Sequence, residues 1–413
     1  MNGSRAAGLI LLLVFLLLSA SFCCAALNAS QNNQLGAEAY RAGDTARALD
    51  YLRQARQDQP YDEQIRKNLA VVLLARGHEL LRQGRYRQAG DLFQQGQELA
   101  PDDTRFLLAR AHALVAEKAY AEAEVVLNEA LGIDDQQAGV WQLLGRVDYL
   151  TNRLEEAIDA WNRALELDPG NTSLQAMLAK ARREAKVESG MEQSYTSSFV
   201  LSYDAAGDPD LGAELLDVLH QAYVELGGNL DVYPAGQVPV LIYTRADFSR
   251  ITASPDWAAG LYDGKIRIPL GGVKQVSAPL QAVLFHEYTH VVVRELAGNH
   301  CPTWLNEGLA ELAGRGRFNP PLRALEQAPA LLDFNSLTGS WKNLPAAEVR
   351  LAYEQSYSFV RYLVDDYGWF QIGDILRDLG AGASADDAFA RVFGSYGLSL
   401  AELQQQWKQD LGR

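Results

Sequence analysis

The amino-acid sequence predicts an all-α array of helical repeats followed by an α+β domain with a helical C-terminal lobe. Three observations predict this fold class. Small and aromatic residues recur every 34 positions between about residues 29 and 171. Apolar runs at 199–203 and 238–243 have the composition of strands and flank a helical pattern at 210–226. Beyond Leu344 the spacing of apolar residues is helical again.

The N-terminal segment 1–26 predicts export. Arg5 precedes an apolar run that is broken only by the polar residues Ser19 and Ser21. The run resembles a secretory signal peptide that ends near Cys24-Ala25-Ala26. At about 20 residues it is also long enough to remain as a membrane anchor. We favour cleavage and expect an extracytoplasmic protein, periplasmic or secreted, with a membrane tether as the alternative.

Residues 29–187 form the repeat array. One unit matches the small, aromatic and proline positions of a tetratricopeptide repeat with Trp141, Leu144, Gly145, Ala157, Trp161, Ala164 and Pro169. The same pattern upstream gives units at approximately 29–62, 70–103, 104–137 and 138–171. About seven extra residues near 63–69 lengthen a helix. Residues 172–187 form a polar capping helix that shields the last apolar face, and 188–190 form a short linker.

The repeats predict a binding surface. Their small residues let paired helices approach closely, so we interpret them as packing residues and not as a site. The concave surface of such an array usually binds a peptide or a protein segment, and we expect a protein partner there. The alternative is that the array is only a rigid spacer.

The segment 286–290 has the sequence HEYTH and predicts a metal site. Residues four apart share one face of a helix, so His286 and His290 can bind one Zn²⁺ while Glu287 lies beside them. In a chain of this composition the pattern is expected by chance at most about 0.01 times. Ser277 as N-cap and helical apolar spacing place the motif in a helix of roughly 18 residues.

A second segment, 304–311, has the sequence WLNEGLAE. Pro302-Thr303 predicts the start of its helix, and Gly314 its end. Together the two segments resemble the gluzincin metallopeptidases, most closely their bacterial peptidase MA-like relatives. The resemblance implies a zincin-like domain over residues 195–413 and is sharpest over 280–314.

The resemblance implies a role for each residue of the site. Glu307 is the third zinc ligand, and Glu311 occupies a position where gluzincins often have an acidic group that orients a ligand histidine. Three protein ligands leave the fourth tetrahedral position open for water. Zinc lowers the pKa of that water from about 15.7 to about 7, and Glu287 can accept its proton as it attacks a carbonyl.

An oxyanion donor is also implied. Residues 352–357, with the sequence AYEQSY, are similar to the tyrosine-bearing helix of aminopeptidase-N-like enzymes, in which a phenol stabilises the tetrahedral intermediate. This implies Tyr353 as a catalytic residue, with Tyr357 as the fallback. The family usually has the pattern YExG, but this chain has Ser356 where glycine is expected. The alternative is that both tyrosines are aromatic residues of the helix core.

Residues 259–269 alternate apolar and polar side chains after a turn, which is typical of an exposed strand near a sheet edge. Gluzincins hold peptide substrates by pairing them with such a strand. The alternative is a hairpin that only packs on the metal helix. Because the exopeptidase pattern GxMEN is absent from the sequence, we expect an endopeptidase.

Composition limits the other functions. The net charge of −15 argues against nucleic acid as a partner, since phosphate binding needs a basic surface. Cleavage after Ala26 would leave only Cys301, so no intramolecular disulfide is expected. His300 and Cys301 are interpreted as surface and packing residues. We therefore predict an exported zinc endopeptidase. The alternatives are a repeat scaffold with a degenerate peptidase domain and a zinc hydrolase of another substrate class.

Overall fold

The fold is described from a computed structural model of the 413-residue chain, for residues 27–203, 210–234, 236–252, 261–269, 275–341 and 344–412. The predicted export segment 1–26 and the beginning of the predicted edge strand at 259–260 lie outside these residues. Within the described ranges, no helix combines the length and the apolarity that crossing a membrane requires.

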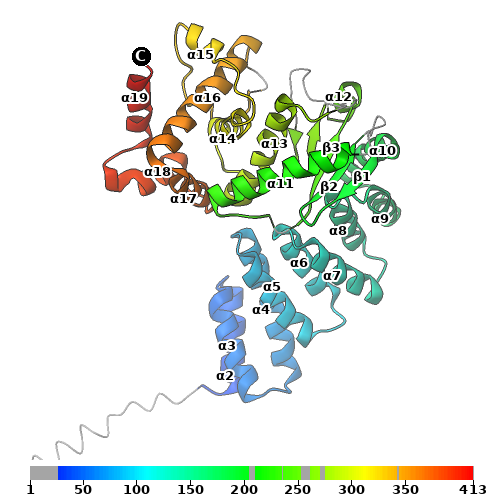
Figure 1. The fold of residues 1–413 in the computed structure, drawn as a ribbon. Coiled ribbons are helices and arrows are strands. Elements are labelled where there is room, and N and C mark those ends of the chain that lie inside the picture. Colours follow the sequence, from blue (N-terminus) through cyan, green and yellow to red (C-terminus); the bar gives the residue numbers. More distant parts are fainter. Residues whose placement is uncertain are drawn as a thin grey trace, which may run out of the picture. The chain divides into compact units, whose positions relative to one another are not determined.

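The predicted repeats are pairs of helices, as expected for tetratricopeptide repeats (Figure 1). Their helices are α2 (Ala29–Arg41), α3 (Thr45–Asp58), α4 (Glu63–Arg82), α5 (Tyr86–Leu99), α6 (Thr104–Ala116), α7 (Tyr120–Ile133), α8 (Ala138–Leu150) and α9 (Leu154–Leu167). Helix α4 has 20 residues because the extra residues near 63–69 extend its N-terminus, which confirms the prediction.

Glycines of the first helix in a pair allow the second helix to approach. A Cβ atom added at Gly77 would lie 2.3 Å from the ring of Phe93, and one at Gly145 would lie 2.4 Å from the ring of Trp161. Both distances are far below van der Waals contact, so only glycine fits at these positions. The periodic small residues are therefore packing residues, as the sequence predicts.

The capping helix α10 (Thr172–Glu188) has two functions in the packing. Its apolar residues Leu174, Leu178 and Ala181 cover the last repeat around Trp161, as predicted. Its carboxylate Glu184 is fully buried, however, and does not face solvent. The helix therefore packs on the sheet as well as on the last repeat. Gln175, Arg182 and Lys186 remain exposed, as the prediction of a polar capping helix expects.

The chain forms two compact units, and the boundary between them lies after Glu117. Helices α2–α6 belong to the first unit, whereas helices α7–α10 belong to the same unit as the sheet. The predicted linker at 188–190 marks a change of secondary structure, because α10 ends at Glu188 and strand β1 begins at Glu192. It does not interrupt the packing, because buried Glu188 accepts a hydrogen bond from Tyr243, at 2.5 Å.

The second unit contains a mixed sheet of five strands in the order β1-β2-β3-β5-β4. The strands are β1 (Glu192–Tyr195), β2 (Phe199–Tyr203), β3 (Val238–Ile242), β4 (Leu261–Tyr262) and β5 (Ile266–Ile268). Strands β2, β3 and β5 are parallel, while β1 and β4 are antiparallel edge strands. The predicted strands at 199–203 and 238–243 are confirmed, but the polar sequence of β1 gave no signal.

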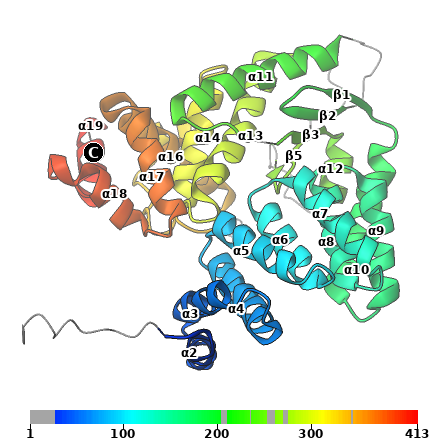
Figure 2. The same cartoon turned by 90° about the horizontal axis from the view of Figure 1, so that it is seen from below.

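Helices cover both faces of this sheet (Figure 2). On one face, alternate residues of β2, β3 and β5 pack against α11 (Leu211–Leu230) and α13 (Ala278–Ala297). On the other face, Leu241 packs with α12 (Arg245–Thr252) and with Val187 of α10. Helix α13 carries the HEYTH motif, so the main core of the unit supports the candidate site directly.

The C-terminal lobe is helical, as predicted, and is coloured yellow to red in Figure 1. Its helices are α14 (Thr303–Arg315), α15 (Arg323–Gln327), α16 (Ala346–Tyr367), α17 (Trp369–Gly380), α18 (Ala385–Phe393) and α19 (Leu400–Asp410). An aromatic cluster that includes Trp304, Phe359 and Trp407 joins α14, α16 and α19. Helix α14 therefore packs against the rest of the lobe through large buried rings.

The strand predicted at 259–269 is partly wrong. Strand β4 is at the sheet edge, as predicted, but two of the alternating polar residues of the hairpin are not exposed. Lys265 and Arg267 have no exposed surface. The buried carboxylate of Glu184 on α10 compensates their charges. The alternation of apolar and polar residues therefore marks two faces of the strand that are both buried, and not one buried face and one face in solvent.

Candidate active site

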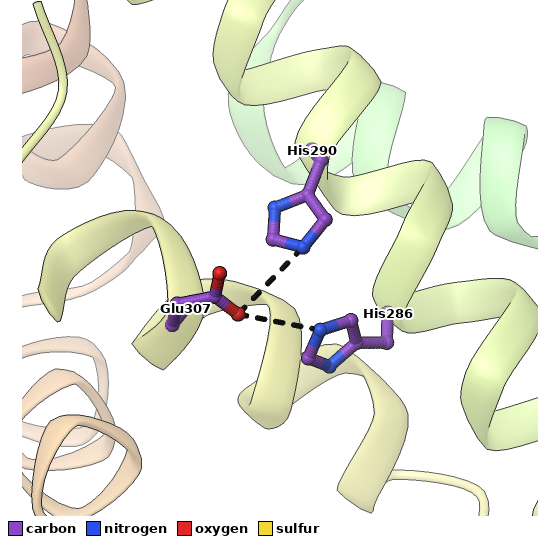
Figure 3. Close-up of side chains that lie close together, drawn as sticks. All are labelled: His286, His290 and Glu307. Atoms are coloured by element: carbon purple, nitrogen blue, oxygen red, sulfur yellow. Dashed lines mark ion pairs between the residues drawn. The ribbon is translucent and has the colours of Figure 1, made fainter. Parts of the chain in front are cut away.

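Helix α13 positions both histidines. The hydroxyl of Ser277 accepts a hydrogen bond from the backbone N–H of Leu280, and a proline follows within the first turn, as predicted. The face formed by Leu284, Phe285 and Tyr288 is buried in the core. His286 and His290 lie on the face that is directed at α14, one helical turn apart (Figure 3).

Helix α14 brings Glu307 to the two imidazoles. Close approach of the helices depends on Gly314, because a Cβ atom there would lie 2.9 Å from the carbonyl oxygen of Ala282 on α13. Gly314 was predicted to end α14, but the helix continues to Arg315 and the glycine serves the packing instead. The Oε2 atom of Glu307 lies 3.4 Å from Nε2 of His286 and 3.7 Å from Nε2 of His290 (Figure 3).

These three side chains fit a divalent metal ion. One ligand atom from each of His286, His290 and Glu307 lies within 4.8 Å of the others. The Oε2 atom of Glu307 is buried and accepts no hydrogen bond. A buried carboxylate oxygen without a donor is costly unless a cation compensates it. Two imidazoles and one carboxylate are also a ligand set that zinc prefers, and one that leaves a coordination position free.

The two ligand histidines are each held through Nδ1. The Nδ1 atom of His290 lies 3.0 Å from Oδ1 of Asn306, and Nδ1 of His286 lies 3.4 Å from Oε1 of Glu311. Both partners can accept a hydrogen bond, so they favour the tautomer with the proton on Nδ1, in which Nε2 has the lone pair that a metal needs. Arg315 in turn donates to the second oxygen of Glu311, at 3.0 Å.

The electrostatics of the site favour a cation. Burial alone would lower the pKa of His286, but the carboxylates of Glu307 and Glu311 outweigh it and raise this pKa well above its usual value. Burial alone would raise the pKa of Glu307, but His290 and His286 outweigh it and lower this pKa. Glu307 is therefore ionised at neutral pH, as a metal ligand must be.

Glu287 lies in the same helix between the two histidines and is only 3% exposed. Burial raises the pKa of its carboxyl group above the usual value, and His290 and His286 oppose this shift in part. A carboxylate with a raised pKa is a better proton acceptor than an ordinary surface glutamate.

The structure distinguishes between the two candidate tyrosines. The ring of Tyr353 lies 6.4 Å from the ring of His286, centroid to centroid, and burial together with Glu307 and Glu287 raises the pKa of its phenol. Tyr353 is therefore a neutral hydrogen-bond donor beside the site. Tyr357 is one turn further along α16, and its ring packs under the guanidinium of Arg315, at 4.6 Å. Tyr357 thus packs against a side chain of α14.

Family models match the helical repeats and the domain that follows them. Residues 219–412 match the Peptidase MA superfamily, and residues 80–147 and 138–171 match two tetratricopeptide repeat families. The chain combines tetratricopeptide repeats with a Peptidase MA superfamily domain. The Peptidase MA domain contains α13, α14 and α16, and therefore all the candidate site residues.

Other similarities are weaker. Human RNA polymerase II-associated protein 3 is 30% identical over 102 residues, which are 25% of this chain. The chain spans only 15% of the length of that curated relative. Among solved structures, the first TPR domain of human RPAP3 is 28% identical, with 28% of this chain and 92% of that chain covered and a TM-score of 0.28. MamA (residues 41 to the end) from Desulfovibrio magneticus RS-1 is 23% identical, with 38% and 85% covered and a TM-score of 0.33.

Sequence reasoning missed three residues around the Peptidase MA domain site. Asn306 and Arg315 support the ligand side chains, and Gly308 lets α14 approach α16. Asn306 carried a weak signal, because asparagine is unfavourable inside a helix unless its side chain has a task. The two residues that were set aside stay outside the ligand group, since His300 is exposed in a turn and Cys301 donates its thiol to the carbonyl of Pro302.

Proposed function

We propose that this chain is an exported zinc-dependent endopeptidase whose repeats bind the substrate or a partner protein. One observation carries the proposal: within a Peptidase MA domain, His286, His290 and Glu307 converge while the buried carboxylate Glu287 lies on the same helix. The donor set, the unsatisfied Oε2 atom and the hydrogen-bond acceptors beside both Nδ1 atoms support zinc as the ion.

The residues of the chain take distinct roles in this proposal. His286, His290 and Glu307 would hold the zinc, which supplies Lewis acidity when bound. Glu287 accepts a proton from the attacking water and then donates it to the nitrogen of the leaving amine, so that a neutral amine leaves when the peptide bond breaks. Tyr353 donates its phenolic hydrogen to the oxygen of the scissile carbonyl as negative charge develops there.

The test compares metal content with turnover. We expect about one zinc per purified chain, and loss of peptide hydrolysis after treatment with a chelator. Glu287→Gln keeps the size of the side chain and removes the base, so it should keep zinc and lose turnover by about 10²-fold or more. His220→Gln changes an exposed histidine of α11 and should alter neither property.

The outcomes separate the functions that the site allows. Undiminished hydrolysis by the Glu287→Gln variant would show that Glu287 is not the base. Zinc binding without hydrolysis of any member of a quenched-peptide library would leave a binding scaffold with an inactive domain. Hydrolysis of an ester but of no peptide would keep the mechanism and change the substrate class.

Export and partner binding are separate parts of the proposal. The apolar segment 1–26 supports export, and N-terminal sequencing of the mature protein should find a start near residue 27. The tetratricopeptide repeats support a peptide or protein ligand. Capture of such a ligand should persist in the Glu287→Gln variant, because the repeats lie outside the catalytic helices.

A further inference from the structure

The strand next to the sheet edge has two buried faces. In β5, Ile266 and Ile268 belong to the core that contains α13, whereas Arg267 projects to the opposite side. Lys265 directly precedes the strand and shares the buried charged contacts of Arg267. All four side chains are without exposed surface. Charged residues are almost never fully buried unless they are paired, so the partners of this basic face determine where the strand lies.

One of those partners belongs to the hairpin itself, because Asp263 accepts from Nη1 of Arg267. The others come from the repeats and their capping helix. The Nη2 atom of Arg267 donates to Oε1 of Glu184 on α10, at 3.2 Å, and to the hydroxyl of Tyr149 on α8, at 3.1 Å. Tyr149 donates to the same Glu184 oxygen, at 2.9 Å. The ammonium of Lys265 donates to Oδ1 of Asn152, at 2.7 Å, and lies 4.2 Å above the ring of Tyr149.

The buried contacts of Glu184, Tyr149, Lys265 and Arg267 fix how α10 and β5 lie against each other. Glu184 and Arg267 are both fully buried, and a buried charge that loses its partner is strongly destabilising. Burial lowers the pKa of Lys265 to about 8, and Glu188 and Glu184 keep the ammonium from losing its proton more readily. Any shift of β5 along α10 would separate at least one of these charges, so the charges specify the register of the two elements.

The position of β5 also determines the position of the edge strand β4, because the two strands are paired. In the antiparallel pair of β4 and β5, Leu261 lies opposite Arg267 and Tyr262 lies opposite Ile266. The residue that Glu184 holds is thus the partner of the first residue of β4. The outer side of β4 has no neighbouring strand in the described part of the sheet, and such an edge can accept an extended peptide.

We propose that Glu184, a residue of the repeat array, is a positioning residue for the peptidase: it holds Arg267 and thereby the edge strand on which an extended substrate binds. This inference rests on the proposed function. It makes α8 and α10 a structural layer of the catalytic domain. A purely structural role would lower stability and affect kcat and KM alike, whereas a positioning role predicts a selective change in substrate binding.

The experiment uses the full chain with Glu184→Gln and, as a matched control, Asp148→Asn. Asp148 is a carboxylate of the same repeats, 4% exposed, and its ion-pair partner is Arg153 within the repeats and not the sheet. Hydrogen exchange of the amides at 261–268 should become about tenfold faster in the Glu184 variant and not in the control. KM for a quenched decapeptide should rise about tenfold, with kcat within about twofold and zinc content unchanged.

Unchanged exchange at 261–268 in folded Glu184→Gln, or equal effects of the control, would overturn the positioning role. If Glu184→Gln does not fold, Tyr149→Phe removes only the hydroxyl that donates to Glu184 and accepts from Arg267, and the same exchange result is expected. An inactive wild-type protein would refute the peptidase proposal, while the exchange measurement would still decide whether Glu184 holds the strand.

Discussion

The imidazoles of the two candidate ligands contact different groups, an amide for His290 and a carboxylate for His286. The carboxylate of Glu311 is itself held by Arg315, whereas Asn306 is neutral and directly precedes Glu307 in α14. One short segment therefore supplies a ligand and the group that orients another ligand. This explains why the spacing within WLNEGLAE matters as much as its composition.

Replacing Asn306 should weaken metal binding. Asn306→Ala removes the acceptor of the His290 Nδ1 proton, so the imidazole loses both its preferred tautomer and its fixed ring orientation. We expect zinc affinity to fall about 10- to 100-fold, measured by competition with a chromophoric chelator. Asn299→Ala, in the exposed turn before α14, is the control and should bind zinc as tightly as the wild type. Equal affinities in both variants would assign Asn306 no role.

The tyrosines make a second prediction at this scale. Tyr353→Phe keeps the ring against Trp341, at 5.0 Å, and removes only the hydroxyl. If the phenol stabilises the oxyanion, kcat should fall about 10²- to 10³-fold with little change in KM or zinc content. Tyr357→Phe keeps its contact with Arg315 and should remain active. A loss confined to the Tyr357 variant would reverse the assignment.

At the scale of helices, Gly308 and Gly314 of α14 allow α16 and α13 to approach closely. A Cβ atom at Gly308 would lie 2.6 Å from the backbone oxygen of Ser356 and 2.5 Å from Val360 on α16. The sequence lacks the family glycine at 356, and the close approach is supplied by the opposite helix instead. The departure of Ser356 from the family pattern is therefore compatible with the same packing.

Gly308→Ala should destabilise this stack. The methyl group must displace backbone atoms of α16, which a packed core tolerates poorly, so we expect the free energy of unfolding to fall by about 1–3 kcal/mol. Urea denaturation measures the change. In the control, Gly132→Ala, the added Cβ in α7 has no atom within 4 Å, and a helical alanine should be neutral or stabilising by up to about 1 kcal/mol. Similar losses in both variants would contradict the packing explanation.

The sequence predicted the repeats, strands β2 and β3, helices α11, α13 and α14, and the convergence of His286, His290 and Glu307, because each follows from local periodicity or motif spacing. It did not predict strand β1, whose polar residues lack an apolar pattern, nor the burial of Lys265 and Arg267. Alternation shows that two faces differ, but it does not show that a carboxylate such as Glu184, some 80 positions upstream, covers the polar one.

At the scale of the whole chain, the candidate metal site belongs to one of two compact units. The chain divides after Glu117, and His286, His290 and Glu307 all lie in the second unit. An ion that binds only the folded site stabilises that unit by mass action, by about 2.7 kcal/mol when free zinc is 100 times its dissociation constant. The first unit gains nothing from the ion directly, so the two units should respond differently to its removal.

Two optical signals can separate these responses. All 7 tryptophans lie between positions 141 and 407, so tryptophan fluorescence reports on the second unit alone, whereas far-UV circular dichroism reports helices of both. Removing zinc with a chelator should lower the midpoint of the fluorescence transition by several degrees, since about 1 kcal/mol shifts a domain of this size by about 2–4 °C. Circular dichroism should show an additional transition that the chelator does not move. A single transition that coincides for both signals and shifts as a whole would mean that the repeats before Glu117 unfold together with the metal site.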